Sequence, residues 1–294
     1  MYSQIDSNKR KSVLLLMLAA ALVVTLGYVF DIAQGGDGYG GLFLGIFISF
    51  FITLISYYQG DKIALWSSGA KPTTKEDNLY VWNILENLCI TAGTPMPKLY
   101  IIEDQAINAF ATGRNPVTAS IAVTRGAIEK LENEELEGVL AHEISHIKNY
   151  DIRFMMLVAI LVGSVSIMAN IFLRTGRFVR RGNDKESGNV TAIFAIVGIV
   201  LAILSPLVAE LIKLAVSRRR EYLADASGSL LTRYPQGLAN ALEKIAAENL
   251  PMQNATPATS HLFISNPFSG KNLSKLFSTH PPIEDRIKKL REMA

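Results

Sequence analysis

The sequence is poor in cysteine and in charged residues. Cys89 is the only cysteine, so an intrachain disulfide is excluded, which is compatible with a reducing cytosol. Asp, Glu, Lys and Arg make up 19% of the 294 residues and hydrophobic residues make up 49%, and the mean hydropathy is positive. This balance is unusual for a water-soluble protein. The net charge of +3 gives no reason to expect a nucleic-acid partner.

The hydrophobic residues gather in four runs, 13–30, 42–58, 155–173 and 192–216. Each run approaches or exceeds the ~18 residues that a bilayer-spanning helix requires. Basic residues precede the first run, as they do in a signal peptide. Its apolar core is longer than the ~7–15 residues of such a peptide, however, and no small-x-small cleavage site follows. We therefore expect four transmembrane helices, the first of them an uncleaved anchor.

Basic residues predict how these helices are oriented. They flank the first run at positions 9–11, the loop 31–41 has none, and three lysines follow the second run: Lys62, Lys71 and Lys75. The amino terminus and the region after residue 60 should therefore be cytoplasmic. The basic loop 174–185 would then lie on the outer face, against the same rule. The alternative is that runs three and four form a re-entrant or partly peripheral hairpin.

Residues 141–146 contain the pattern His142-Glu143-x-x-His146, in a segment with helical spacing of apolar residues. Histidines four residues apart share one helix face, where both can reach one Zn²⁺. Glu143 would lie near the open coordination position and could act as a general base. Asn133 is the expected N-cap of this helix. The alternative is an amphipathic helix with two packed or solvated histidines.

A second pair of polar residues follows the fourth apolar run. Glu221 and Asp225 are also four residues apart, so one can bind the metal while the other holds a histidine ligand by its second nitrogen. A site with two histidines needs a third ligand, and Glu221 is the best placed acid. Two membrane crossings between residues 146 and 221 would return the chain to the same side. Solvated surface carboxylates are the alternative.

A small sheet is expected before the metal helix. The sequence predicts a turn at 71–74, a helix over 76–92 that ends at Gly93, and strands at 98–102, 108–113 and 120–124. An edge strand of such a sheet can bind an extended substrate through backbone hydrogen bonds. A structural meander is an equally good interpretation. A further helix is expected over 235–249, followed by a loop at 250–260.

The combined motifs resemble those of HtpX-type integral-membrane zinc metallopeptidases, which are relatives of the CAAX prenyl proteases. The resemblance covers nearly the whole chain, including residues 108–113 and the two amino-terminal spans. It rests on His142-Glu143-x-x-His146, a following membrane hairpin, Glu221-x-x-x-Asp225 and Thr279-His280-Pro281-Pro282. It implies a gluzincin site, the bacterial inner membrane, and quality control of membrane proteins under heat stress.

The resemblance also implies roles for single residues. One Zn²⁺ per chain would be bound by His142, His146 and Glu221. Glu143 would be the general base, and Asp225 would orient His142. The strand that binds substrate would be Asn108, Ala109 and Phe110. A late His and Arg would lie at the active site and stabilise the oxyanion, and these are His280 and Arg286; a structural helix start is the alternative for this pair.

The expected fold is a mainly α membrane protein with four transmembrane helices and a cytoplasmic α+β zincin-like catalytic domain containing a small sheet. We expect a membrane hairpin at 1–60, the first catalytic part at 61–153, a second hairpin at 154–216 and the second catalytic part at 217–294. Both termini would be cytoplasmic, and membrane proteins would be the substrates. A prenyl-peptide processing protease and a non-catalytic zinc-binding membrane adaptor are the alternative functions.

Overall fold

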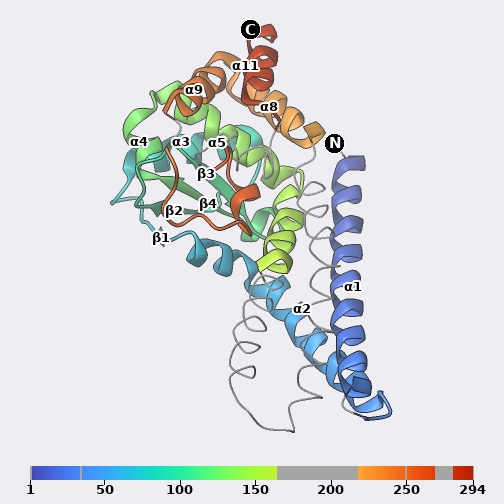
Figure 1. Cartoon of the computed structure of the whole chain (residues 1–294). Coiled ribbons are helices and arrows are strands. Elements are labelled where there is room, and N and C mark those ends of the chain that lie inside the picture. Colours follow the sequence, from blue (N-terminus) through green and yellow to red (C-terminus); the bar gives the residue numbers. More distant parts are fainter. Residues whose placement is uncertain (1, 34, 164–217, 249, 269–280, 294) are drawn as a thin grey trace.

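The computed structural model describes residues 2–33, 35–163, 218–248, 250–268 and 281–293. Two long helices form a hairpin that extends away from a part built around a four-stranded sheet (Figure 1). The described end of the chain, α11, lies on the sheet-containing part, and the amino terminus of α1 lies beside that part.

The hairpin consists of α1 (Tyr2–Ala33) and α2 (Tyr39–Ser67). Two segments, Ile5–Val29 and Tyr39–Ser67, are long and apolar enough to cross a membrane. The two helices approach closely because glycines face one another. A Cβ on Gly41 would lie 2.0 Å from the carbonyl oxygen of Gly27, and a Cβ on Gly45 would lie 2.9 Å from the Cα of Val24. Small residues of this kind let apolar helices pack backbone to backbone.

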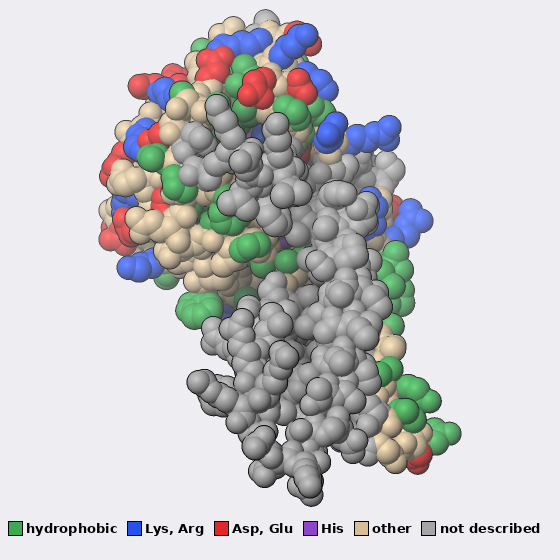
Figure 2. Space-filling model, viewed as in Figure 1, with side chains coloured by type: hydrophobic (Ala, Val, Ile, Leu, Met, Phe, Trp, Pro, Cys, Tyr) green, Lys and Arg blue, Asp and Glu red, His purple; other side chains and the backbone are tan. Residues whose placement is uncertain are grey.

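Large hydrophobic side chains on α2 point away from the rest of the described chain. Phe43 is 69% exposed and Phe47 is 62% exposed, for example. Figure 2 shows that charged side chains gather over the sheet-containing part, while the visible part of the hairpin carries mainly hydrophobic side chains. A helix begins at Asp151 and is described as far as Gly163. The rest of the third expected span, the basic loop 174–185 and the fourth span lie outside the described residues.

The helix α2 continues past residue 60, where the first hairpin was expected to end. A mixed sheet follows it. Its strands are β1 (Ala70–Pro72), β2 (Lys98–Ile102), β3 (Ala109–Thr112) and β4 (Ser120–Thr124). They lie in the order β1-β2-β4-β3, with β2 and β4 parallel and the other two pairs antiparallel. The turn expected at 71–74 therefore starts inside a strand: Lys71 and Pro72 pair with Ile101 and Tyr100. Pro72 is tolerated because β1 is an edge strand.

Helices cover the sheet and complete the core. They are α3 (Leu79–Ala92), α4 (Arg125–Lys130), α5 (Asn133–Lys148), α8 (Arg218–Thr232), α9 (Pro235–Glu248) and α11 (Ile283–Glu292), with short 3₁₀ turns η1 (Pro116–Thr118) and η2 (Ser260–Leu262). α3 ends at Gly93, whose φ of 62° suits glycine. Buried apolar residues of α3, β4, α5 and α9 form the main hydrophobic core.

The helix α5 lies at the centre of this core, in contact with β3, α3, α8 and α9. Asn133 is its first helical residue, so the expected cap was wrong by one position. Glu132 is the N-cap, and its backbone N–H donates to Glu135 Oε2 at 2.8 Å. Glu135 is the third helical residue, and its side chain is long enough to accept a hydrogen bond from the N-cap backbone N–H. Gly138 lets α9 approach, because a Cβ there would lie 2.7 Å from the backbone nitrogen of Leu238.

Candidate active site

Two histidines of α5 lie on one face of the helix, one turn apart. His142 and His146 are both buried, and their Nε2 atoms are 3.1 Å apart. The two rings stand nearly perpendicular, at 88°. This arrangement follows from the i, i+4 spacing on a helix. Both Nε2 atoms therefore converge on one point.

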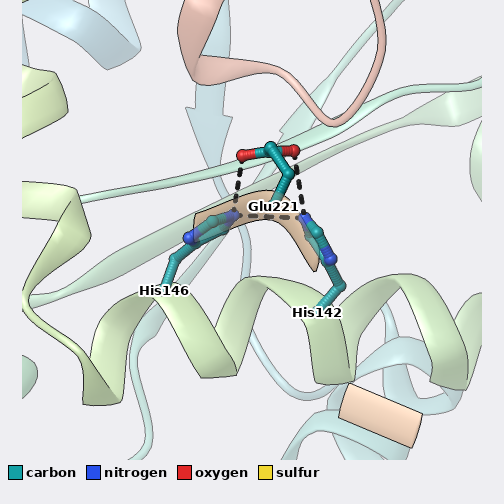
Figure 3. A group of neighbouring side chains, drawn as sticks. All are labelled: His142, His146 and Glu221. Carbon is teal, nitrogen blue, oxygen red and sulfur yellow. Dashed lines mark hydrogen bonds and ion pairs between the residues drawn. The ribbon is translucent and has the colours of Figure 1, made fainter. Parts of the chain in front are cut away.

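The third side chain of the cluster comes from α8. Glu221 Oε2 lies 3.9 Å from His142 Nε2, and Glu221 Oε1 lies 3.6 Å from His146 Nε2 (Figure 3). The helices α5 and α8 can come this close because Gly228 faces α5. A Cβ on Gly228 would lie 3.0 Å from the backbone nitrogen of His142. The sequence therefore places a residue without a side chain where α8 meets the backbone of α5.

The ligand atoms of His142, His146 and Glu221 lie within 4.8 Å of one another, and they are the metal-binding group found among the described residues. Tetrahedral zinc with bonds of 2.0–2.1 Å requires ligand atoms roughly 3.3 Å apart. The separations of 3.1, 3.6 and 3.9 Å bracket that value. Two imidazoles and one carboxylate are also the donor set of catalytic zinc sites. The three residues therefore fit a zinc ion.

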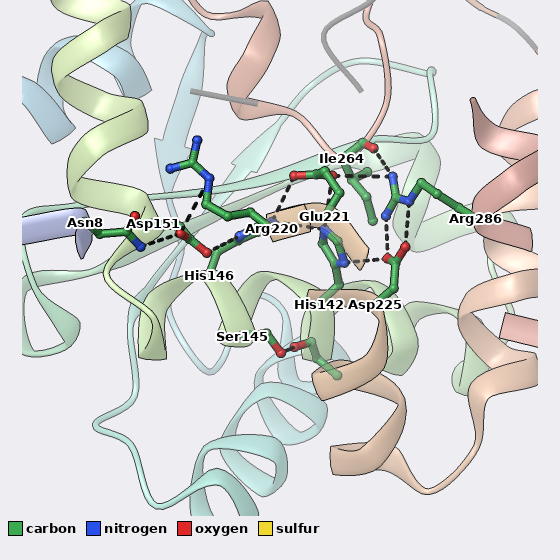
Figure 4. Close-up of polar contacts among 11 residues, drawn as sticks. Asn8, His142, Ser145, His146, Asp151, Arg220, Glu221, Asp225, Ile264 and Arg286 are labelled. Carbon is green, nitrogen blue, oxygen red and sulfur yellow. Dashed lines mark hydrogen bonds and ion pairs between the residues drawn. The ribbon is translucent and has the colours of Figure 1, made fainter. Parts of the chain in front are cut away.

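The second nitrogen of His142 faces Asp225, which lies one turn after Glu221 on α8. His142 Nδ1 and Asp225 Oδ1 are 2.9 Å apart. Arg286 of α11 holds the same carboxylate with two hydrogen bonds, of 2.9 Å from Nε and 2.7 Å from Nη2 (Figure 4). Burial alone would raise the pKa of Asp225, but Arg286 and His142 lower it to about 2. Asp225 is therefore ionised and fixed in position.

Arg286 is engaged with the protein on several sides. Besides Asp225, its Nη1 donates to the carbonyl oxygen of Ile264 at 3.0 Å and lies 3.7 Å from Glu221 Oε2. The guanidinium is fully surrounded, and only 1% of the residue is exposed. Nε, Nη1 and Nη2 each donate to a protein acceptor, so the guanidinium joins α11 to α8 and to the segment after η2. Its predicted partner His280 lies outside the described residues.

The second histidine has an outer partner that was not predicted from the sequence. His146 Nδ1 lies 3.0 Å from Asp151 Oδ2, and Asn8 of α1 donates to Asp151 Oδ1 at 2.7 Å and to the carbonyl oxygen of Asn149 at 2.9 Å. All of these side chains are buried. A carboxylate behind a histidine ligand fixes its tautomer and orientation. The available signal was an acid five residues after His146 and four residues before the third apolar run.

The general base predicted from the sequence, Glu143, is buried beside the three ligands. Burial raises the pKa of Glu143 to about 7, with Glu221 adding to the rise and His146 and the Ala111 N–H opposing it. Glu143 Oε2 has no hydrogen-bond partner among the described atoms. Near neutral pH such a carboxyl group is present in both its protonated and its ionised form, so it can both accept and return a proton.

The two histidines differ in their protonation. Burial lowers the pKa of both, but Asp151 and Glu221 outweigh burial at His146 and raise its pKa to about 9. At His142 burial prevails, because Arg286 and His146 offset part of the effect of Asp225, and the pKa is lowered. A metal ion would therefore displace a proton from His146.

The predicted substrate strand is an edge of the sheet, but it is not open. Asn108, Ala109 and Phe110 are buried, and residues 263–265 run along their free side. Ile264 N–H donates to the Ala109 carbonyl oxygen at 2.9 Å, and Phe110 forms an antiparallel bridge with Phe263. An extended peptide can pair at Ala109 only after residues 263–265 move.

Comparison with known proteins shows the family of the chain. The profile of peptidase family M48 matches residues 75–294. The chain belongs to peptidase family M48. The matched region contains all of the residues that form the cluster and its neighbours except Asn8.

Relatives extend this likeness to the amino-terminal hairpin. The M48 chain is 44% identical over 292 residues to a "Protease HtpX homolog" of Dictyoglomus thermophilum, covering 99% of this chain and 94% of that protein. It is 44% identical over 301 residues to one of Tropheryma whipplei, covering 100% and 98%. The chain is a membrane-associated metalloprotease, as the resemblance in the sequence predicted.

A solved structure shows the same fold at greater distance. The crystal structure of S. mikatae Ste24p has a TM-score of 0.53 and 18% sequence identity, and the alignment covers 99% of this chain and 67% of that one. At this identity the likeness concerns the fold alone.

Proposed function

We propose that this M48 metallopeptidase is a zinc-dependent endopeptidase of the bacterial inner membrane that cleaves misfolded or damaged membrane proteins in their cytoplasmic segments. One Zn²⁺ would be bound by His142, His146 and Glu221. The observation that carries the proposal is the position of Glu143, whose buried carboxyl group lies beside a three-ligand cluster. A structural zinc site would be closed by a fourth protein ligand and would not need this acid.

Zinc in this cluster would supply a Lewis acid that makes water nucleophilic near neutral pH and polarises the scissile carbonyl. Glu143 takes the proton of the attacking water and then delivers it to the leaving amine. Asp225 and Asp151 hold the rings of His142 and His146 in the orientation that presents both Nε2 atoms. Because Arg286 is bound to Asp225 and Ile264, we propose that it positions Asp225. We propose His280 as the oxyanion donor.

The position of the site supports substrates at the membrane surface. α2 leads through residues 68–69 directly into β1, and the helix that begins at Asp151 starts five residues after His146. Short connections therefore join α2 to the sheet and the metal helix α5 to the helix that begins at Asp151. We propose that both termini and the site are cytoplasmic, that four helices cross the bilayer, and that β3 pairs with substrate once residues 263–265 have moved.

The decisive experiment replaces Glu143 with Gln in the purified full-length protein. We expect bound zinc to remain at one per chain, measured by metal analysis, and cleavage of a membrane-protein substrate to fall at least 10³-fold. The matched control is Glu137→Gln on the same helix, which should keep activity. Cleavage by Glu143→Gln at the wild-type rate, with its zinc verified, would refute the assignment.

Two further measurements separate the alternatives. Removal of the metal with a chelator should abolish cleavage, and added zinc should restore it, which an adaptor protein would not show. A prenyl-peptide protease would prefer a prenylated peptide to an unmodified membrane-protein loop.

Orientation can be tested in a Cys89→Ser background with Asn133→Cys and Gly36→Cys. Labelling of the first of these from outside the cell would reverse the proposed topology.

A further inference from the structure

Tyrosine and lysine side chains mark two levels on the hairpin. On α2, Tyr39 and Tyr58 are nineteen residues apart and are 66% and 54% exposed. On α1, Lys9 and Tyr28 are also nineteen residues apart. At 1.5 Å per residue, each interval is about 28 Å, close to the ~30 Å of a bilayer hydrocarbon core. Tyrosines concentrate at the two boundaries of that core.

The markers of the two helices match at both ends. Tyr28 packs against the turn before Tyr39, since a Cβ on Gly38 would lie 2.3 Å from its ring. At the other end, Lys9 lies 4.8 Å from the Tyr150 ring, and Arg153 lies 5.3 Å from Tyr150 and 5.9 Å from Tyr57. These contacts connect the start of α1 to α2 at the level of Tyr58. One membrane boundary therefore passes between the hairpin and the catalytic part.

Three cations gather at this level, which we call the boundary cluster: Lys9, Arg114 and Arg153, with Tyr57, Tyr58 and Tyr150. Arg114 lies 4.7 Å from the Tyr58 ring and 5.9 Å from the Tyr57 ring. Arg153 Nε donates to the Arg114 carbonyl oxygen at 2.6 Å, which holds the two residues together. Both arginines are half-buried.

The cations of the boundary cluster lack the carboxylate partner that several other arginines of the described chain have. Arg125, Arg286 and Arg291 each lie within 4 Å of a carboxylate. Among the described residues, the three cations of the boundary cluster have no such partner. The rings hold the cations in place, and arginine and lysine without a carboxylate partner can bind a phosphate by charge-assisted hydrogen bonds. The anion abundant at a membrane boundary is the lipid phosphate, and basic residues there favour anionic headgroups.

We propose that the boundary cluster binds the phosphate headgroup of an anionic phospholipid in the leaflet that faces the catalytic part. The proposal rests on the membrane-crossing hairpin of the proposed function and does not depend on the peptidase chemistry. Arg114 follows β3 by two residues, and Arg153 follows Asp151 by two residues. A lipid bound here would therefore hold the catalytic part at a set height above the bilayer.

The test is lipid binding to the delipidated full-length protein in a neutral detergent, measured by native mass spectrometry. The probes are phosphatidylglycerol, phosphatidylcholine and inorganic phosphate. We expect wild type to prefer phosphatidylglycerol. Arg114→Gln/Arg153→Gln should bind it about 30-fold more weakly, at roughly fivefold per basic residue. The control Arg125→Gln/Arg291→Gln removes the same charge from paired arginines and should bind as wild type does.

A second variant guards against loss of folding in the double variant. Lys9 is exposed, and Lys9→Gln should weaken phosphatidylglycerol binding about fivefold while its thermal unfolding matches wild type. The proposal is overturned if both boundary variants bind phosphatidylglycerol as wild type does, or if the control loses as much affinity as they do. It is also overturned if inorganic phosphate displaces the lipid at equal concentration, since the site would then be one for free phosphate.

Discussion

The metal cluster and the helical hairpin expose opposite kinds of side chain. In the cluster, His142, His146, Glu221, Asp225 and Arg286 are at most 4% exposed. In the hairpin, large hydrophobic residues such as Phe43 and Phe47 are more than half exposed. A water-soluble protein buries charged side chains only where they are paired, as they are in this cluster, and it rarely exposes so many large hydrophobic residues side by side. The difference indicates that each region is adapted to its own surroundings. The cluster is surrounded by polar partners within the protein, and the hairpin is suited to lipid.

The two regions are also held together by different forces. In the cluster, each carboxylate behind a histidine is held by a donor from a distant part of the chain, namely Arg286 for Asp225 and Asn8 for Asp151. In the hairpin, glycines allow the two backbones to touch. Buried charge is stable only while its partner remains, and backbone contact only while no side chain intervenes. Each predicted variant below removes one of these conditions.

The largest effect is expected from Arg286→Met. Met preserves much of the volume but leaves Asp225 buried without its two hydrogen bonds, which should lower the free energy of unfolding by about 3–5 kcal/mol. Zinc affinity should fall as well, because Asp225 also contacts Nδ1 of His142. Thermal unfolding in detergent and chelator competition measure the two effects. Unchanged stability in this variant would mean that Asp225 finds another partner.

The next effect concerns the outer partner of His146. Asp151→Asn keeps the shape but removes the charge that favours Nδ1–H, so zinc should bind about 10–100-fold more weakly. Asn8→Ala should cause a smaller loss in the same direction, because it only loosens Asp151. Asp77→Asn, an exposed residue that contacts Thr74, is the control. Equal zinc affinity in Asp151→Asn and wild type would show that His146 is oriented without this carboxylate.

Local patterns were enough to predict much of the fold and part of the site. The helix of His142 and His146, the strands at 98–102 and 120–124 and the stop at Gly93 depend on residues near in sequence, whose spacing determines which side chains share a face. The structure also brings Glu221 to the two histidines. This contact joins distant segments, but it could be expected because a site with two histidines requires a third ligand.

Other contacts between distant segments could not be predicted from the sequence, because no such chemical requirement links their residues. Asn8 reaches Asp151 from α1, Ile264 pairs with β3, and Arg286 binds Asp225, and each pairing depends on how whole elements pack. Nothing in the spacing of Asn108, Ala109 and Phe110 could indicate that residues 263–265 cover them. A single arginine near a predicted site has the same sequence signal whether it faces substrate or a buried carboxylate.

In the hairpin, Gly41→Ala should separate α1 from α2. Its new Cβ would lie 2.0 Å from the Gly27 carbonyl oxygen, and we expect a loss of about 1–3 kcal/mol in the free energy of unfolding. Gly40 is the matched control, since a Cβ there would lie 3.5 Å from its nearest neighbour, Asp31 Oδ1. Gly40→Ala should be neutral or slightly stabilising. If both variants unfold alike in detergent, the hairpin is not held by close backbone contact.

The smallest effect is expected from Arg125→Met, which removes an ion pair with the same geometry as that of Arg286. Arg125 donates to Glu103 from Nε at 3.3 Å and from Nη2 at 2.8 Å, but the two side chains are 31% and 56% exposed. Water solvates both charges before and after the substitution, so we expect a loss of only about 0–1 kcal/mol, reduced further by salt. The same unfolding measurement applies. A loss as large as that of Arg286→Met would show that the geometry of an arginine–carboxylate pair, and not its burial, determines its contribution in this protein.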